Sequence, residues 1–388
     1  MVRKTIEISN HELMKRINRA KVLNAIRLNL SLSRSDIARL VGLDKKSITN
    51  FVSEIIAEGL VEEVGRKMVA KGRPLTLLDF SHDGPLVAGL DISAECVSGV
   101  LLDFRGEIYS SQSVPLGENA AAAVIAKAVK NVFASLEEVA KKRLYGTGLS
   151  VQGVIDLEQG LVIESINLPG LRGFNFRESF EKISDRKMYF EESSRAKALA
   201  EKWFGAGRQH DDFVCIDLGV GIGAGLVSDR RLYRGAGEYA GEIGHVVIER
   251  AGRECRCGNR GCLEAYLSER VLLEKIGGAA TGARSLAEIG EVDSGARKVL
   301  EQAGSDLGEG LAVLVNVMNP TTIILNGNLM RFEDIVMPKV WEGLKRNSLA
   351  ACLEGTEVIA STLPQAAALG AAAVVLSEVF ELEGYYYI

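Results

Sequence analysis

One histidine and three cysteines lie within 18 residues of one another, in the pattern H-x9-C-x-C-x4-C. They are His245, Cys255, Cys257 and Cys262. Imidazole and thiolate groups are ligands that zinc prefers, and four protein ligands close a tetrahedral site with no open position for water. Half of the six cysteines fall in this segment, which favours a metal over disulfides. The sequence therefore predicts a structural zinc site, with metal-free reduced thiols as the alternative.

Charge is distributed unevenly along the 388 residues. Residues 1–80 carry 15 Lys and Arg against 9 Asp and Glu, a net charge of +6, whereas the remainder carries 31 against 42, a net charge of −11. A basic head on an acidic body indicates that the head alone binds a polyanion. The chain has no run of about 18 uncharged apolar residues and no signal-peptide core, so we expect a cytoplasmic protein without a membrane partner.

The basic head contains three helical patterns in close succession. Apolar residues recur at helical spacing over 11–29. Ser33, with Asp36 three residues later, is typical of a capping-box start for a second helix that Gly42 closes. Asp44 can cap a third helix over 45–59. This spacing is typical of a helix-turn-helix, whose second helix enters the major groove of DNA with its N-terminal residues.

The third predicted helix has a polar side that suits DNA contact. Lysine can reach phosphates or guanine, asparagine can pair with adenine, and serine or threonine can serve either purpose. An ordinary solvated helix face is the alternative explanation. The candidate DNA-binding residues of this helix are Lys45, Lys46, Ser47, Thr49 and Asn50.

Two strand-like runs follow over 60–80, around a basic tip that contains glycine. The arrangement is typical of the wing of a winged helix. Arg73, beside Pro74 at the tip, is expected to contact DNA either in a narrow minor groove or at a phosphate. We therefore predict that residues 1–80 form a helical winged helix-turn-helix domain that binds double-stranded operator DNA. Because such proteins bind symmetrical half-sites, a homodimer or a dimer of dimers is expected.

The acidic body repeats one plan at an offset of 126 residues. In each of the segments 89–109 and 215–233, an apolar strand ends in an aspartate, Asp91 or Asp217, and a second strand passes through a glycine. Such self-similarity predicts two related α/β subdomains, each a mixed sheet flanked by helices, at 81–205 and 206–388. A ligand cleft between them is the natural expectation.

The two halves resemble the ribonuclease-H-like subdomains of the sugar kinase, actin and heat-shock ATPase superfamily. The segment 238–268, EYAGEIGHVVIERAGRECRCGNRGCLEAYLS, is similar to the signature of the ROK family (repressors, open reading frames and kinases). Head and body together resemble its repressor branch, the xylose, N-acetylglucosamine and mannose repressor type. The resemblance implies the same four zinc ligands.

The resemblance also implies a sugar site. ROK kinases hold the sugar with an asparagine before Leu-Pro, a Glu-Asn-Asp run, and two glutamates and a histidine of the signature. The resemblance maps these roles to Asn167, to the run Glu191, Glu192 and Ser193, and to Glu242, His245 and Glu264. Carboxylates accept strong hydrogen bonds from sugar hydroxyls. A solvated surface acid is the alternative for either glutamate alone, and a monosaccharide or a derivative is the expected effector.

The catalytic parts of the kinases are missing from this sequence. The resemblance places Ser193 where the kinases carry their catalytic aspartate, and a serine cannot deprotonate a sugar hydroxyl unaided. The first phosphate loop, D-I-G-G-T in the kinases, is DISAE at 91–95, where side chains and a negative charge replace the glycines. The second loop at 218–225 keeps its glycines. The sequence thus predicts no catalytic residue, a structural zinc ion and no ATP.

Three functions are compatible with these observations. The predicted one is a sugar-responsive repressor whose inactive, kinase-like body changes DNA affinity when a sugar closes the cleft. The alternative is an ATP-dependent hexose or N-acetylhexosamine kinase. The third is a regulator that ignores sugar and responds to a protein partner.

Overall fold

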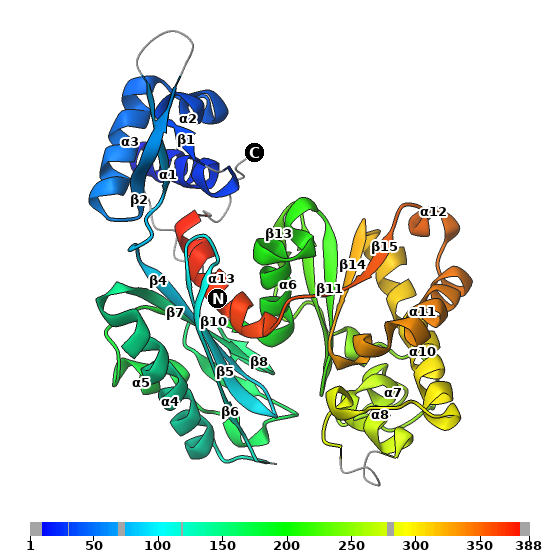
Figure 1. Cartoon of the computed structure of the whole chain (residues 1–388). Helices are drawn as coiled ribbons and strands as arrows, with labels where there is room; N and C mark the ends of the chain where they lie inside the picture. Colours follow the sequence, from blue (N-terminus) through cyan, green and yellow to red (C-terminus); the bar gives the residue numbers. More distant parts are fainter. Residues whose placement is uncertain (1–9, 30, 69–73, 118, 278–282, 381–388) are drawn as a thin grey trace.

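The structure is a computed structural model that describes residues 10–29, 31–68, 74–117, 119–277 and 283–380. A small N-terminal head stands on a larger body with two lobes, and each lobe is built around one five-stranded sheet (Figure 1). No helix of these described ranges is long and apolar enough to cross a membrane.

The head combines three helices with a three-stranded antiparallel sheet. Its elements are α1 (Asn10–Leu28), β1 (Leu32–Ser33), α2 (Arg34–Val41), α3 (Lys45–Ala57), β2 (Val61–Lys67) and β3 (Leu75–Phe80). Ser33 and Asp36 form the predicted capping box, and Gly42 ends α2 in the left-handed conformation. Asp44 accepts hydrogen bonds from the first amides of α3. A glycine in the left-handed conformation at the end of α2 and the Asp44 side chain at the start of α3 therefore fix the two ends of the short turn between these helices, as the sequence predicts.

The two body sheets have the same strand order. The first sheet is β10-β7-β4-β5-β6 and the second is β15-β14-β11-β12-β13. The central strand of each sheet, β4 or β11, is antiparallel to the strand that follows it and parallel to β7 or β14. Asp91 and Asp217 are each the penultimate residue of their central strand. The duplication predicted from the 126-residue offset is therefore present in the strand order.

The strand bounds are β4 (Leu86–Ile92), β5 (Cys96–Asp103), β6 (Ile108–Pro115), β7 (Leu144–Val151), β10 (Met188–Glu192), β11 (Phe213–Leu218), β12 (Ile222–Ser228), β13 (Arg231–Tyr233), β14 (Thr322–Asn326) and β15 (Glu357–Ala360). A two-stranded ribbon of β8 (Val154–Asp156) and β9 (Leu161–Glu164) extends the first lobe. The α-helices among the described residues of the body are α4 (Ala122–Ala140), α5 (Phe176–Glu181), α6 (Ser193–Phe204), α7 (Glu264–Leu267), α8 (Glu269–Ile276), α10 (Ser294–Met318), α11 (Glu333–Asn347), α12 (Ala350–Leu353) and α13 (Ala366–Phe380). Helix α4 packs on the first sheet, and α10 and α11 pack together on the second lobe.

Helices α6 and α13 exchange lobes. Each follows the last parallel strand of its own sheet, yet α13 packs on the first sheet and α6 on the second (Figure 1). A β-carbon on Gly148 of β7 would lie only 1.8 Å from the Ala371 carbonyl oxygen, so glycine permits the approach of α13. Each helix thus lies on the opposite side of the predicted 205/206 boundary from the sheet on which it packs, because a helix after a parallel strand need not cover its own sheet.

The head rests on the ends of these two helices. The Arg27 guanidinium carbon of α1 lies 4.3 Å from the ring centroid of Trp203 on α6. Asn24 Nδ2 donates a hydrogen bond of 2.7 Å to the Phe380 carbonyl oxygen at the end of α13. Apolar residues of the head and of both helices belong to one continuous buried cluster. The head is thus packed against the body.

Candidate metal centre and ligand site

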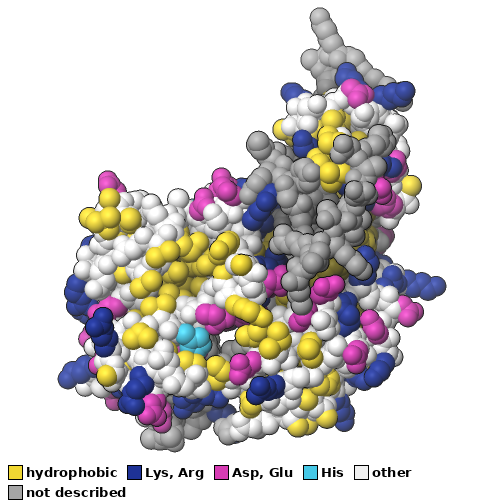
Figure 2. Space-filling model, turned by 180° about the vertical axis from the view of Figure 1, so that it is seen from behind, with side chains coloured by type: hydrophobic (Ala, Val, Ile, Leu, Met, Phe, Trp, Pro, Cys, Tyr) yellow, Lys and Arg dark blue, Asp and Glu magenta, His cyan; other side chains and the backbone are white. Residues whose placement is uncertain are grey.

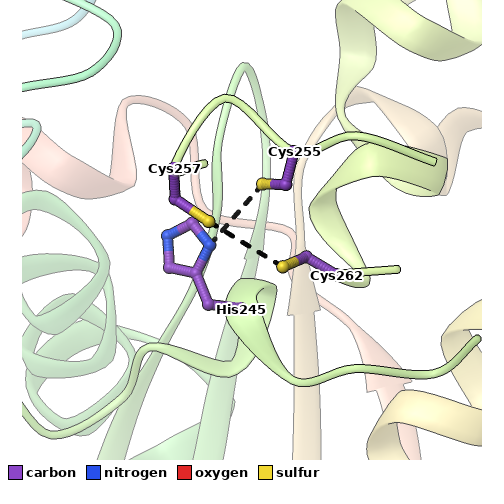
Figure 3. Close-up of side chains that lie close together, drawn as sticks. All are labelled: His245, Cys255, Cys257 and Cys262. Carbon is purple, nitrogen blue, oxygen red and sulfur yellow. Dashed lines mark hydrogen bonds between the residues drawn. The ribbon is translucent and has the colours of Figure 1, made fainter. Parts of the chain in front are cut away.

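The four predicted metal ligands point toward one another (Figure 3). Their ligand atoms all lie within 4.8 Å of one another. Cys257 Sγ is 3.9 Å from Cys262 Sγ, and Cys255 Sγ is 3.8 Å from His245 Nδ1. A tetrahedral zinc ion with Zn–S bonds of about 2.3 Å holds its sulfur atoms about 3.8 Å apart. The four side chains therefore have the spacing and the chemistry of a closed, four-coordinate site.

Backbone geometry brings the three thiols together. Gly258 and Gly261 have φ values of +90° and +77°, which favour glycine. A β-carbon on Gly261 would lie 1.8 Å from the Glu249 carbonyl oxygen, so no larger residue fits there. Cys255 N donates a hydrogen bond of 2.8 Å to the Asn259 carbonyl oxygen. This loop thus holds its cysteines close together through its own backbone hydrogen bonds.

His245 links the metal ligands to the predicted sugar site. Its Nδ1 faces Cys255, while its Nε2 lies 3.9 Å from Glu242 Oε2. A metal on Nδ1 leaves the proton on Nε2, so the ring would present an N–H group toward Glu242. Burial and the nearby Glu264 carboxylate raise the pKa of Glu242. The two roles predicted for His245 therefore use different ring nitrogens.

Asn167 and Glu264 meet at Gly221, in the loop between β11 and β12. A β-carbon on Gly221 would lie 3.0 Å from Asn167 Nδ2 and 3.2 Å from Glu264 Oε2. Ile222 N donates a hydrogen bond of 3.0 Å to this glutamate oxygen. Asn167 Oδ1 accepts a hydrogen bond of 2.9 Å from Arg256, which projects from the cysteine loop. Asn167 belongs to the first lobe and the others to the second, so the structure brings the predicted residues together across the two lobes.

The residues of the run 191–193, which replaces Glu-Asn-Asp of the kinases, have hydrogen-bond or ion-pair partners within the protein. Fully buried Glu191 lies between Arg195 Nε and Arg234 Nη2, each at 2.7 Å. Burial raises the pKa of Glu191, but the two guanidinium groups outweigh it and bring the pKa below its ordinary value. Glu192 caps α6 by accepting hydrogen bonds from the backbone amides of Ser194 and Arg195. Burial raises the pKa of Glu192 to about 7.

Ser193 and Lys197 surround the paired aspartates. Ser193 Oγ and Ser150 Oγ both donate to Asp91 Oδ1, at 3.5 and 2.7 Å. Lys197 Nζ lies 2.5 Å from Asp217 Oδ1. Burial raises the pKa of Asp91 to about 6, although the Ser150 hydroxyl and the Lys197 ammonium both oppose the rise. The Lys197 ammonium therefore pairs with Asp217 and also lowers the pKa of Asp91, and Ser193 has a carboxylate as its partner.

Side chains also occupy the segments that correspond to nucleotide loops. Ser93 Oγ accepts hydrogen bonds from the amides of Glu95 and Cys96, so these amides already have a partner. Burial and the Glu269 carboxylate raise the pKa of Glu95. Asn328 Nδ2, just after β14, donates to Glu269 Oε1 at 3.1 Å. Carboxylates thus gather where a triphosphate would add further negative charge.

The DNA-binding candidates of α3 are mostly exposed. The exposed residues are Lys45, Lys46, Thr49 and Asn50. Ser47 is half-buried, and its Oγ donates a hydrogen bond of 2.6 Å to Asp44 Oδ2, so it contributes to the helix cap. Arg73 lies outside the described residues. Figure 2 shows several Lys and Arg side chains at the end of the head farthest from the body.

Several side chains of the site were not predicted from the sequence, among them Arg195, Lys197, Arg234 and Arg256. Lys197 interrupts the otherwise apolar helix segment 196–200, which was a usable signal. Arg256 stands between two predicted metal ligands, yet nothing in the local pattern indicates its contact with Asn167. The other two give no signal that separates them from ordinary polar residues.

Known proteins of one family share this arrangement. A sequence model of the ROK family matches residues 87–378. A xylose repressor of Caldicellulosiruptor bescii is 30% identical over 97% of this chain and 100% of its own. A ROK family transcriptional regulator described as a homologue of the Escherichia coli MLC protein superposes with a TM-score of 0.79 at 24% identity, over 95% of this chain and 97% of its own. A ROK family glucokinase from Streptomyces griseus, in complex with glucose and AMPPNP, superposes with a TM-score of 0.65 at 26% identity, over 75% of this chain and 98% of its own. The chain belongs to the ROK family.

Proposed function

We propose that this protein is a sugar-responsive, DNA-binding transcriptional repressor of carbohydrate metabolism. The observation that carries the proposal is the difference in how much of the chain each known protein covers. The xylose repressor aligns with 97% of the chain, whereas the glucokinase covers 75% and the family model begins at residue 87. The head is thus the part that the repressor shares and that the family model does not cover.

In this proposal the head is a winged helix-turn-helix domain over residues 1–80. Helices α2 and α3 form the helix pair, and β2 and β3 form the wing. The exposed start of α3 would enter the major groove, with Asn50 at a base and the lysines at bases or phosphates. Because each half-site takes one head, we propose a homodimer or a dimer of dimers on operator DNA.

The body is proposed to bind a monosaccharide or a derivative without phosphorylating it. Asn167, Glu242, His245 and Glu264 would hold the ligand between the ribonuclease-H-like lobes. A kinase would need a free base and accessible phosphate-binding amides. Here Ser193 is hydrogen-bonded to Asp91, and Ser93 occupies the amides of the first loop. A sugar kinase therefore has less support, although the glucokinase shares the body fold.

The metal is proposed to be a structural zinc ion. Three thiolates and one imidazole fill four positions, so no site remains for an activated water. Through His245 the ion would also fix the ring that faces Glu242. Zinc would thereby stabilise the sugar site.

A matched pair of charge variants tests the DNA-binding role. The target duplex is first selected from a random library with the wild-type protein. Lys45→Ala, Lys46→Ala is then compared with Lys127→Ala, Lys130→Ala, which removes the same charge from exposed positions of α4. Only the α3 pair should weaken binding, and it should lower the slope of log affinity against log salt by about 2.

Asn50→Ala tests base recognition on the same duplex. It should cost about 1–3 kcal/mol and relax the base preference at one position, with little change in salt dependence. If the two double-lysine variants bound the duplex with equal affinity, α3 would not be the recognition helix. Sugar phosphorylation at ordinary kinase rates, about 1–100 per second, would overturn the repressor assignment of the body.

A further inference from the structure

Gln152 has an unmet hydrogen-bonding capacity at the proposed sugar site. It follows β7, and its Oε1 is buried with no hydrogen-bond partner in the described structure. Nearly all buried side-chain polar atoms are hydrogen-bonded, so each exception needs a specific explanation such as a missing ligand or water.

The backbone holds this residue firmly in place. Gln152 N donates a hydrogen bond of 3.3 Å to the Ile92 carbonyl oxygen, and its carbonyl oxygen accepts one of 2.7 Å from Ser165 Oγ. The same serine hydroxyl accepts a hydrogen bond from the amide of Leu168. Ser165 therefore ties Gln152 to the loop that carries Asn167.

The Gln152 side chain faces the point where the sugar-site residues meet. A β-carbon on Gly221 would lie 3.7 Å from Gln152 Nε2, in addition to its short distances to Asn167 Nδ2 and Glu264 Oε2. Two amides and one carboxylate, drawn from both lobes, thus surround a position that a glycine leaves open. The Arg256 guanidinium also lies here, but it is hydrogen-bonded to Asn167 Oδ1 and to the Ile166 carbonyl oxygen.

We propose that Gln152 binds the effector directly, with its amide hydrogen-bonded to a hydroxyl group of a neutral monosaccharide. The inference rests on the sugar-responsive function proposed above and adds a residue and a ligand class to it. A sugar hydroxyl donates and accepts, so it can satisfy an amide whichever way the amide is turned. The Glu264 carboxylate disfavours a phosphate group at this position, because like charges repel.

The inference makes opposite predictions for the free and the ligand-bound protein. Gln152→Leu replaces the unpaired amide by an apolar group of similar size. It should leave the melting temperature of the free protein unchanged or raise it, because the buried Oε1 has no hydrogen-bond partner to lose. It should weaken sugar binding about 3- to 10-fold, which is the effect of one hydrogen bond. A merely structural glutamine would give a lower melting temperature and unchanged binding.

The test uses the full-length, zinc-loaded protein and a panel of D-xylose, D-glucose, N-acetyl-D-glucosamine and their phosphate esters. Melting temperatures and calorimetric affinities are measured for wild type, Gln152→Leu and Gln152→Asn, which keeps the amide on a shorter side chain. Gln112→Leu makes the same change at an exposed position of β6 and serves as the control. We expect a neutral sugar to bind wild type and the control equally, and both Gln152 variants more weakly.

The outcomes separate this inference from the function on which it rests. A sugar that binds wild type and Gln152→Leu with equal affinity overturns the role of Gln152 and leaves the repressor function intact. Preferential binding of a phosphate ester that the Gln152 variants do not affect also overturns it. If no sugar of the panel binds wild type, the inference and the sugar-responsive part of the function both fail. Should Gln152→Leu not fold, the amide has a structural partner and the inference is wrong.

Discussion

Replacing Lys197 by methionine should destabilise the body strongly. Lys197 Nζ lies 2.5 Å from Asp217 Oδ1, and the two side chains are only 18% and 5% exposed. Removing one partner of a buried ion pair costs about 3–5 kcal/mol, because the other charge remains buried without compensation. Methionine keeps most of the apolar length of lysine, so the loss reports on the charge. For a unit of this size we expect the melting temperature to fall by about 6 °C or more.

A second substitution distinguishes lost charge from lost packing. Lys197→Met with Asp217→Asn removes both charges, and replacing a buried ion pair by neutral groups is often close to neutral in stability. The double variant should therefore melt higher than the Lys197→Met single variant. The single variant also leaves Asp91 near Asp217 without a cation between them. Because ionised Asp91 would then repel Asp217, the loss should be larger at about pH 8 than at about pH 5.

Scanning calorimetry measures these differences, with Lys130→Met on the exposed side of α4 as the control. A double-mutant cycle from the four melting temperatures isolates the coupling between Lys197 and Asp217. If Lys197→Met melted within about 1 °C of wild type, or if the double variant were as unstable as the single one, the ammonium would not be the counter-ion of the paired aspartates.

Three further predictions concern the metal, the pH dependence of stability and the contact between head and body. Chelation of zinc, or Cys262→Ser, should lower the melting temperature of the second lobe, and calorimetry with metal analysis checks this. Because the pKa of Asp91 is raised to about 6, the stabilising contribution of Asp91 is complete below about pH 4 and is lost as pH rises through 6. In Asp91→Asn the free energy of unfolding should therefore lose about 3 kcal/mol of its pH dependence over this range, which thermal unfolding at several pH values measures. Arg27→Ala removes the stacking on Trp203 and should speed proteolysis between head and body by severalfold, which timed digestion measures.

The parts of the structure that the sequence predicted correctly depend on short-range patterns. The capping box of Ser33 and Asp36 and the cap at Asp44 involve residues at most three apart, so the bounds of α2 and α3 follow from them. The metal ligands lie within 18 residues, and two glycines set their loop. In both cases the signal and the structure share the same short segment.

The contacts that complete the site connect distant segments. Arg256 hydrogen-bonds to Asn167, which lies 89 residues earlier in the chain. The Gln152 side chain lies near Gly221, which belongs to a loop of the other lobe. Lys197 offered a local anomaly, but its partner Asp217 depends on α6 packing on the second sheet. No pattern of residue types predicts such pairings, because they depend on how the two lobes are placed.

The exchange of α6 and α13 connects the two ends of this protein physically. At its first turn α6 carries the Glu192 cap and Ser193, beside the paired aspartates, and near its last turn it carries Trp203 under Arg27 of the head. Twelve helical residues span about 18 Å as a rigid unit. A ligand that favours one angle between the lobes must therefore also favour one position of the surface on which the head rests. The repeat in the sequence predicts two lobes, but it does not predict the helix that crosses between them and reaches the head.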